Sequence, residues 1–101
     1  MDKTLQIVDT LSKLGERFRF PDLDRAIRHM VCEAAEALDA HLRMTDTGET
    51  RAHQKDYDLE IELGQVIIMA TLALYNMYSS LDEAVDKALE QMVKDRQWPK
   101  Q

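Results

Sequence analysis

The sequence predicts an all-α fold in a single domain covering residues 1–101. Apolar residues recur at intervals of three and four over four segments, which is the spacing of one face of a helix. The chain holds only three glycines and two prolines, whereas an all-β domain needs frequent turns built from such residues. Hydrophobic residues make up 45% of the chain, a proportion typical of a globular domain and well above that of a disordered one.

The first predicted helix covers Lys3 to Arg17 and ends before Pro21, because a proline pushes the residue preceding it out of the helical region. The second begins at Pro21 or Asp22, both favourable at a helix start, and continues to about Met44. The apolar stripe of the second helix consists of Leu23, Ala26, Ile27, Met30, Ala34, Ala37 and Leu38.

The third predicted helix follows a polar loop at residues 45–50 and runs from about Lys55 to Tyr78. Its first half, residues 56–62, is acidic, whereas residues 66–74 are apolar on every side of the helix. A helix with no polar face has to be covered all round. Three short neighbouring helices of one chain are too few for that, so this segment predicts a homodimer or a higher homo-oligomer.

The last predicted helix begins at Ser80, with Glu83 three residues later completing a capping box. One face of it is apolar, and the segment ending in Trp98 and Pro99 closes the chain. Together the four segments predict a four-helix bundle that is completed by oligomerisation.

Charge and composition exclude several classes of function. A net charge of −6 without a cluster of basic residues disfavours binding to a nucleic-acid polymer, although a free nucleotide carried by a divalent cation remains compatible. Cys32 is the only cysteine, which suits a reducing compartment. The first residues are too polar for a signal peptide, and the apolar run at 63–80 is too polar for a membrane span. We therefore expect a cytoplasmic protein with no membrane partner.

Four acidic residues are candidates for a metal site. Glu33 and Glu36 lie three residues apart and so project from one face of the second helix. Glu62 lies where the third helix turns from acidic to apolar, and Asp58 precedes it by one turn. Carboxylates that converge between two antiparallel helices make a site suited to Mg²⁺ or Mn²⁺. The alternative is that these acids are solvated helix faces, as most helical charges are.

The order of these motifs resembles that of a known family. The segment Cys-Glu-Ala-Ala-Glu at 32–36 is followed, after 25 residues, by Glu-Leu-Gly-Gln-Val at 62–66. This pair resembles the motifs of the all-α nucleotide pyrophosphohydrolases of the MazG type. The segment at 18–23, with Pro-Asp after two phenylalanines, looks like the family's approach to the same helix, and the ending at 92–99 is similar to its basic tail.

The resemblance implies a MazG-like four-helix domain in which Glu33, Glu36 and Glu62 are the metal ligands and catalytic acids, with Mg²⁺ (or Mn²⁺) as cofactor. Two positions depart from the family pattern. Cys32 stands where the family has its first Glu, and Gln65 stands where it has Asp. A thiol is a poor ligand for Mg²⁺ and an amide is neutral, so the site carries less negative charge than the family's.

Five further residues complete the predicted site. Asp58 is the nearest acid that could replace a missing ligand. By resemblance, Lys94 and Arg96 match phosphate-contacting residues of the tail, and His29 stands where the family often has Lys. Phe20 could stack on a base. The alternatives are that the two cations stabilise a helix C-terminus, that the histidine lies on the surface and that the phenylalanine pins two helices together.

The function implied by the resemblance is Mg²⁺-dependent hydrolysis of a nucleoside triphosphate, ribo or deoxy, to the monophosphate and pyrophosphate, a house-cleaning activity. Two alternatives stay open. The altered acidic positions favour a catalytically impaired protein that binds a nucleotide without turnover. The second alternative is a purely structural helical interaction module, in which the carboxylates have no chemical role.

Overall fold

The fold is all-α, as the sequence predicts. The computed structural model describes residues 2–47 and 59–95, and of residues 44–47 it describes the backbone alone. Every regular element in this part of the chain is helical: α1 (Lys3–Ser12), the short 3₁₀ helix η1 (Gly15–Arg17), α2 (Leu23–Thr47), α3 (Leu59–Asn76) and α4 (Leu81–Asp95).

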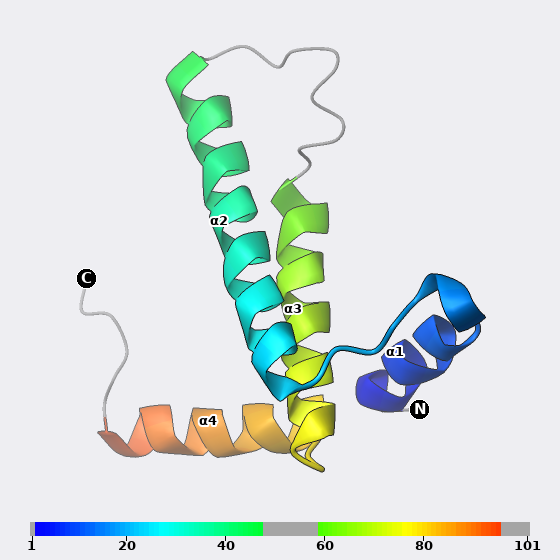
Figure 1. Ribbon diagram of the computed structural model, residues 1–101. Helices are drawn as coiled ribbons and strands as arrows, with labels where there is room; N and C mark the ends of the chain where they lie inside the picture. The colour runs from blue at the N-terminus through cyan, green and yellow to red at the C-terminus, as the bar shows by residue number, and fades with distance from the viewer. Residues whose placement is uncertain (1, 48–58, 96–101) are drawn as a thin grey trace.

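The helices α2 and α3 form a long antiparallel pair, which is the main packing unit of the chain (Figure 1). Helix α1 lies against the other side of α3, and α4 leaves the C-terminal end of α3 and points away from the pair. One chain therefore supplies four α-helices among its described residues but does not arrange them as a closed bundle. The bundle completed by oligomerisation stays a prediction.

Three polar side chains begin the helices. Asp2 accepts a hydrogen bond from the backbone N–H of Thr4 at 2.8 Å, and Asp22 accepts one from Arg25 at 2.8 Å. The predicted cap at Ser80 is confirmed, since its Oγ accepts from the backbone N–H of Glu83 at 3.1 Å. Such caps satisfy backbone donors that have no partner within the helix.

Three predicted helix ends are wrong. Helix α1 stops at Ser12 instead of Arg17, and Gly15, the first residue of η1, takes a φ of +60° that an α-helix does not allow. Helix α2 continues to Thr47, three residues past the predicted end and into the predicted loop. Helix α3 ends at Asn76 because Tyr78, the predicted last residue, takes a φ of 59°. The predicted start of α3 at Lys55 lies outside the described residues.

Two long-range hydrogen bonds tie the elements together at the C-terminal end of α3. The Asn76 side-chain amide donates to the carbonyls of Pro21 at 3.0 Å and Leu72 at 2.9 Å, which fixes the start of α2 against the end of α3. The backbone N–H of Leu81 donates to the hydroxyl of buried Thr4 at 2.7 Å, which fixes the start of α4 against α1.

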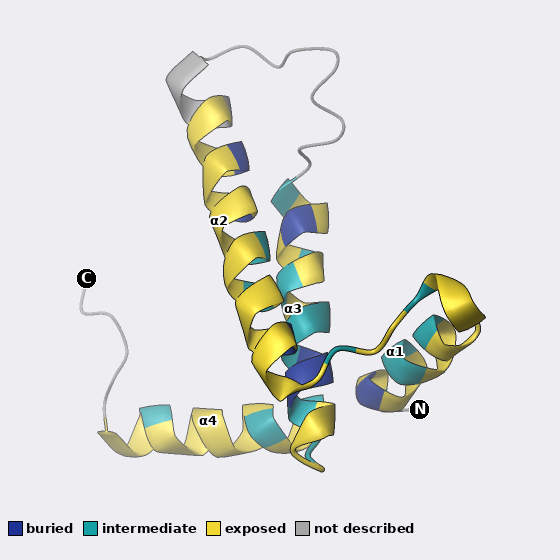
Figure 2. Cartoon of the chain, viewed as in Figure 1, coloured by how far each residue is buried: buried dark blue, intermediate teal, exposed yellow. Residues whose placement is uncertain are grey.

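The buried core is small. The buried hydrophobic residues of the described part are Ala26, Ala37, Ala40, Leu72 and Ala73. Alanines on α2 let the backbone of α3 approach closely, but they remove little apolar area from water. Figure 2 shows burial confined to the facing sides of the helices, while α2 and α4 are exposed along most of their length. Large aliphatic side chains are thus left on the outside of every helix.

Helix α3 is the most apolar element. By length and composition alone it could cross a membrane, with 18 residues at a mean hydropathy of 1.2, and 22% of it is buried inside the chain. The core helix of a water-soluble protein passes the same test. Here α3 packs between α1 and α2, and its Glu62 is buried against α2. The expectation of no membrane partner stays a prediction.

Candidate metal centre

Three of the predicted acids come together between α2 and α3. Glu33 and Glu36 lie on consecutive turns of α2, and Glu62 lies in the first turn of α3, where the antiparallel pairing brings it opposite them. One carboxylate oxygen of each lies within 4.8 Å of the other two. Glu62 is buried at 8% exposure, Glu33 is half-buried and Glu36 is exposed. The acidic cluster is therefore shielded from solvent at Glu62 and open to solvent at Glu36.

Gln65 joins two of these acids. With its amide nitrogen turned toward the carboxylates, it donates to Glu33 Oε2 at 2.9 Å and to Glu62 Oε2 at 3.1 Å. Two carboxylates at such a distance repel each other, and a shared N–H donor offsets part of that repulsion. The neutral Gln65 therefore belongs to the cluster. Its oxygen could face a cation instead, because rotation of the amide exchanges its two ends.

The pKa of Glu33 is raised above its ordinary value of 4.5. Burial is the largest cause, followed by the negative charge of Glu36 and a side-chain hydrogen bond with it, then by the charge of Glu62. The positive charge of His29 acts in the opposite direction. Glu33 therefore keeps its proton more readily than an isolated glutamate does, and a cation placed beside it would displace that proton.

The donor set fits a small hard cation. Mg²⁺ prefers oxygen ligands at about 2.0–2.1 Å, so two ligands on opposite sides of it lie roughly 4.2 Å apart. Carboxylate oxygens within 4.8 Å of one another need only a small side-chain rotation to reach that separation. Carboxylates usually supply part of a Mg²⁺ coordination shell, with waters and substrate phosphates in the rest. The open side at Glu36 leaves room for such ligands.

A basic cavity adjoins the acids. It has a volume of about 260 Å³ and is lined by Phe18, Arg19, Pro21, Arg25, His29 and Met69. His29 lies one turn before Glu33 on α2, so the cavity and the acidic cluster meet at this pair. Sequence reasoning named His29 but missed Arg19 and Arg25. Both arginines lie close to the Pro-Asp helix start, and Arg25 precedes His29 by one turn. This spacing could have predicted them from the sequence.

Of the remaining predicted residues, those that the structure describes are not part of the acidic group. Phe20 is 40% exposed and packs edge-on against Phe18 of the same segment, with ring centroids 5.1 Å apart. Lys94 lies in the last turn of α4, which points away from the α2–α3 pair (Figure 1). Asp58 and Arg96 lie outside the described residues. Cys32 is an exposed free thiol outside the acidic group.

The comparisons with known proteins find no match to this chain. No model of a protein family matches the chain, and no similar protein is found among curated sequences or among solved structures.

Proposed function

We propose that the protein is a Mg²⁺-dependent nucleoside triphosphate pyrophosphohydrolase that acts on ribo- or deoxynucleotides. Water cleaves the bond between the α- and β-phosphates, and the products are a nucleoside monophosphate and pyrophosphate. The observation that carries this proposal is the meeting of Glu33, Glu36 and Glu62 within 4.8 Å of one another. The resemblance of the same residues to the motifs of the MazG-type enzymes supports it.

In this proposal the three carboxylates hold Mg²⁺, or Mn²⁺ in its place. A cation held there would neutralise phosphate charge and make a bound water more acidic. Glu33, whose pKa is raised, would release its proton when a cation binds. A carboxylate oxygen of Glu33 or Glu36 that does not hold the cation could then accept a proton from the attacking water. Buried Glu62 fixes the position of the group, because its surroundings leave it little room to move.

The basic cavity is the proposed place for the nucleotide. Arg19, Arg25 and His29 offer positive or hydrogen-bonding groups to phosphate oxygens, and arginine can grip them with two parallel bonds. Phe18 and Met69 supply an apolar wall of the kind on which a base packs. The cavity and the acids adjoin, so a triphosphate could reach from one to the other. A cytoplasmic location, expected from the sequence, would give such an enzyme access to free nucleotides.

A second function is favoured by one observation. Gln65 donates to both Glu33 and Glu62, which stabilises the acids without a cation, and as a neutral residue it adds no charge of its own to bind one. A protein that holds a nucleotide with weak or no turnover would have such a site. The structural module, the third possibility, gives no reason for three acids to meet beside a basic cavity.

A screen for released pyrophosphate tests the proposal. All common nucleoside and deoxynucleoside triphosphates are incubated with the protein and Mg²⁺ or Mn²⁺, and the products are separated by chromatography. We expect a monophosphate and pyrophosphate in equal amounts for at least one substrate, loss of activity in Glu62→Gln and full activity in Glu60→Gln, which alters an exposed acid of the same helix. Nucleotide binding without products would favour the second function, and no binding would contradict both.

A further inference from the structure

We infer that the hollow between α1 and α3 binds a medium-chain fatty acid, an aliphatic chain that ends in a single carboxylate. The hollow has a volume of about 360 Å³ and is lined by Lys3, Gln6, Ile7, Thr10, Leu11, Gly64, Ile67 and Ile68. This volume lies at the lower end of the range for ligand sites, so it suits a chain of about eight to ten carbon atoms. None of these residues belongs to the acidic cluster or to the basic cavity, so the inference does not depend on the proposed function.

The floor of the hollow is aliphatic and packs against the core. Ile7, Leu11 and Ile68 are half-buried and contact the buried residues of the core. Side chains that are packed in this way keep their positions, so the floor is formed before a ligand arrives. Ile67 also lines the hollow and is 51% exposed, so an alkyl chain bound there would remove apolar surface from water.

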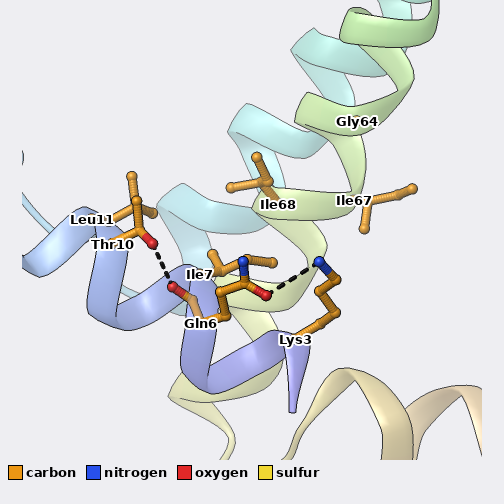
Figure 3. Close-up of a pocket in the computed structure, with 8 residues that line it drawn as sticks. All are labelled: Lys3, Gln6, Ile7, Thr10, Leu11, Gly64, Ile67 and Ile68. Carbon is orange, nitrogen blue, oxygen red and sulfur yellow. Dashed lines mark hydrogen bonds between the residues drawn. The ribbon is translucent and has the colours of Figure 1, made fainter. Parts of the chain in front are cut away.

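Gly64 enlarges the hollow on the side of α3. It lies in the first half of that helix, where a glycine costs stability relative to alanine. A Cβ added there would meet no described atom within 4 Å, so the packing of the chain does not require a glycine at this position. Figure 3 shows Gly64 one turn along α3 from Ile67 and Ile68, which line the same hollow. The missing side chain lets an alkyl chain lie close to the helix backbone.

Two hydrogen-bond donors in the first turns of α1 fit a carboxylate. The ammonium of Lys3 donates to Oε1 of Gln6 at 3.2 Å. This bond uses one of the three ammonium protons and turns the amide oxygen toward Lys3, which leaves the amide nitrogen of Gln6 as a second donor. Figure 3 shows both nitrogen atoms on the side of α1 that faces α3. A carboxylate can therefore accept from both groups while its alkyl chain lies on the aliphatic floor.

The charge of the hollow favours a carboxylate over other head groups. Lys3 is the only charged residue among the described residues that line it, although the chain carries a net charge of −6. One ammonium balances the single charge of a carboxylate in a charge-assisted hydrogen bond. A phosphate carries nearly two charges at neutral pH, an alkyl amine would be repelled, and an alcohol brings no charge at all.

Isothermal titration with octanoate and octanol, both below the concentrations at which they aggregate, tests the role of Lys3. We expect the parent to bind octanoate at least about tenfold more tightly than octanol. Lys3→Gln should lose this preference, and the matched control Lys13→Gln, which removes the same charge at the other end of α1, should keep it. No binding of octanoate to the parent, equal affinity for the acid and the alcohol, or equal losses in the two variants would overturn the inference.

Gly64→Leu tests the position of the alkyl chain. Leucine favours a helix and fills part of the hollow, so octanoate should bind at least about tenfold more weakly while circular dichroism shows the helices intact. Ala35→Leu adds a leucine at an exposed position on α2 and should bind octanoate as the parent does. Unchanged affinity in Gly64→Leu, or an equal loss in Ala35→Leu, would contradict this position.

Sedimentation with vesicles of phosphatidylglycerol distinguishes a free fatty acid from a lipid surface. We expect the parent to stay in the supernatant, because the hollow holds one short chain and a single cation. Sedimentation that Lys3→Gln abolishes would assign the hollow to a membrane surface and would overturn the inference.

Discussion

Gln65 shows how one residue can change the balance of a carboxylate cluster. Its amide donates to Glu33 and Glu62, whereas the family motif that it resembles has an acid at this position. The amide stabilises the empty cluster, and a carboxylate would stabilise the loaded one. A neutral residue at position 65 therefore favours the metal-free cluster, and a negatively charged one favours the metal-bound cluster.

Gln65→Asp should lower the free energy of unfolding without metal by about 1 kcal/mol and raise the affinity for Mg²⁺ at least about tenfold. The added charge repels the three acids until a cation neutralises it. Gln65→Met is the control, since it removes the bridging donor without adding charge and should gain no affinity. Denaturant unfolding and isothermal titration of Mg²⁺ measure the two quantities. An unchanged affinity in Gln65→Asp would mean that position 65 does not face the metal.

The raised pKa of Glu33 predicts a pH dependence of stability. Below its ordinary value of 4.5 the carboxyl is protonated in both states. Above 4.5 the unfolded chain loses this proton while the folded chain keeps it, so stability falls as pH rises until the folded group ionises too. Denaturant unfolding without metal between pH 4.5 and 7 should show this fall in the parent and a smaller one in Glu33→Gln. Identical pH profiles of stability in the parent and in Glu33→Gln would contradict the assignment of this fall to the raised pKa of Glu33.

At the scale of the elements, the end of α3 carries a residue in a strained conformation. Tyr78 takes a φ of 59° and is fully exposed. The backbone N–H groups of Tyr78 and Ser79 donate to the carbonyls of Tyr75 at 3.0 Å and Leu74 at 2.9 Å. This is the helix ending in which glycine usually occupies the left-handed position. A tyrosine there keeps the turn at a cost in backbone strain.

Tyr78→Gly should therefore raise the free energy of unfolding by about 1 kcal/mol, because it relieves the strain and removes no buried contact. Tyr75→Gly, placed inside the helix, should lower it instead. Thermal unfolding of the two variants measures the difference. A loss of stability in Tyr78→Gly would show that the exposed ring makes a contact in the assembled protein.

Helical elements and the acidic cluster could be predicted from the sequence because both depend on local spacing. Ser80 and Asp22 mark helix starts, and the three-residue spacing of Glu33 and Glu36 fixes one shared face. The left-handed residues Gly15 and Tyr78 could not be placed, since helical periodicity continues through both. The basic cavity was missed because Arg19 lies outside the helix that holds its other cations.

At the scale of the whole molecule, the chain combines a well-defined pair of helices with faces that it does not cover itself. The acids lie between α2 and α3, the most extensively packed pair of helices in the described part of the chain, and the uncovered aliphatic side chains lie on the outer sides. The positions of α1 and α4 could not be predicted from the sequence, because an apolar stripe does not specify whether its cover is the same chain or another copy. The candidate site, by contrast, is complete enough within one chain to be tested directly.

The central claim is that Glu33, Glu36 and Glu62 bind one divalent cation. Titration of Mn²⁺ followed by electron paramagnetic resonance measures this most directly, because free and bound Mn²⁺ give different signals. We expect one bound ion per chain in the parent and in Glu60→Gln, and an affinity at least about tenfold weaker in Glu62→Gln. Equal binding in all three proteins, or none in the parent, would contradict the claim and leave the acids as an unloaded cluster between two helices.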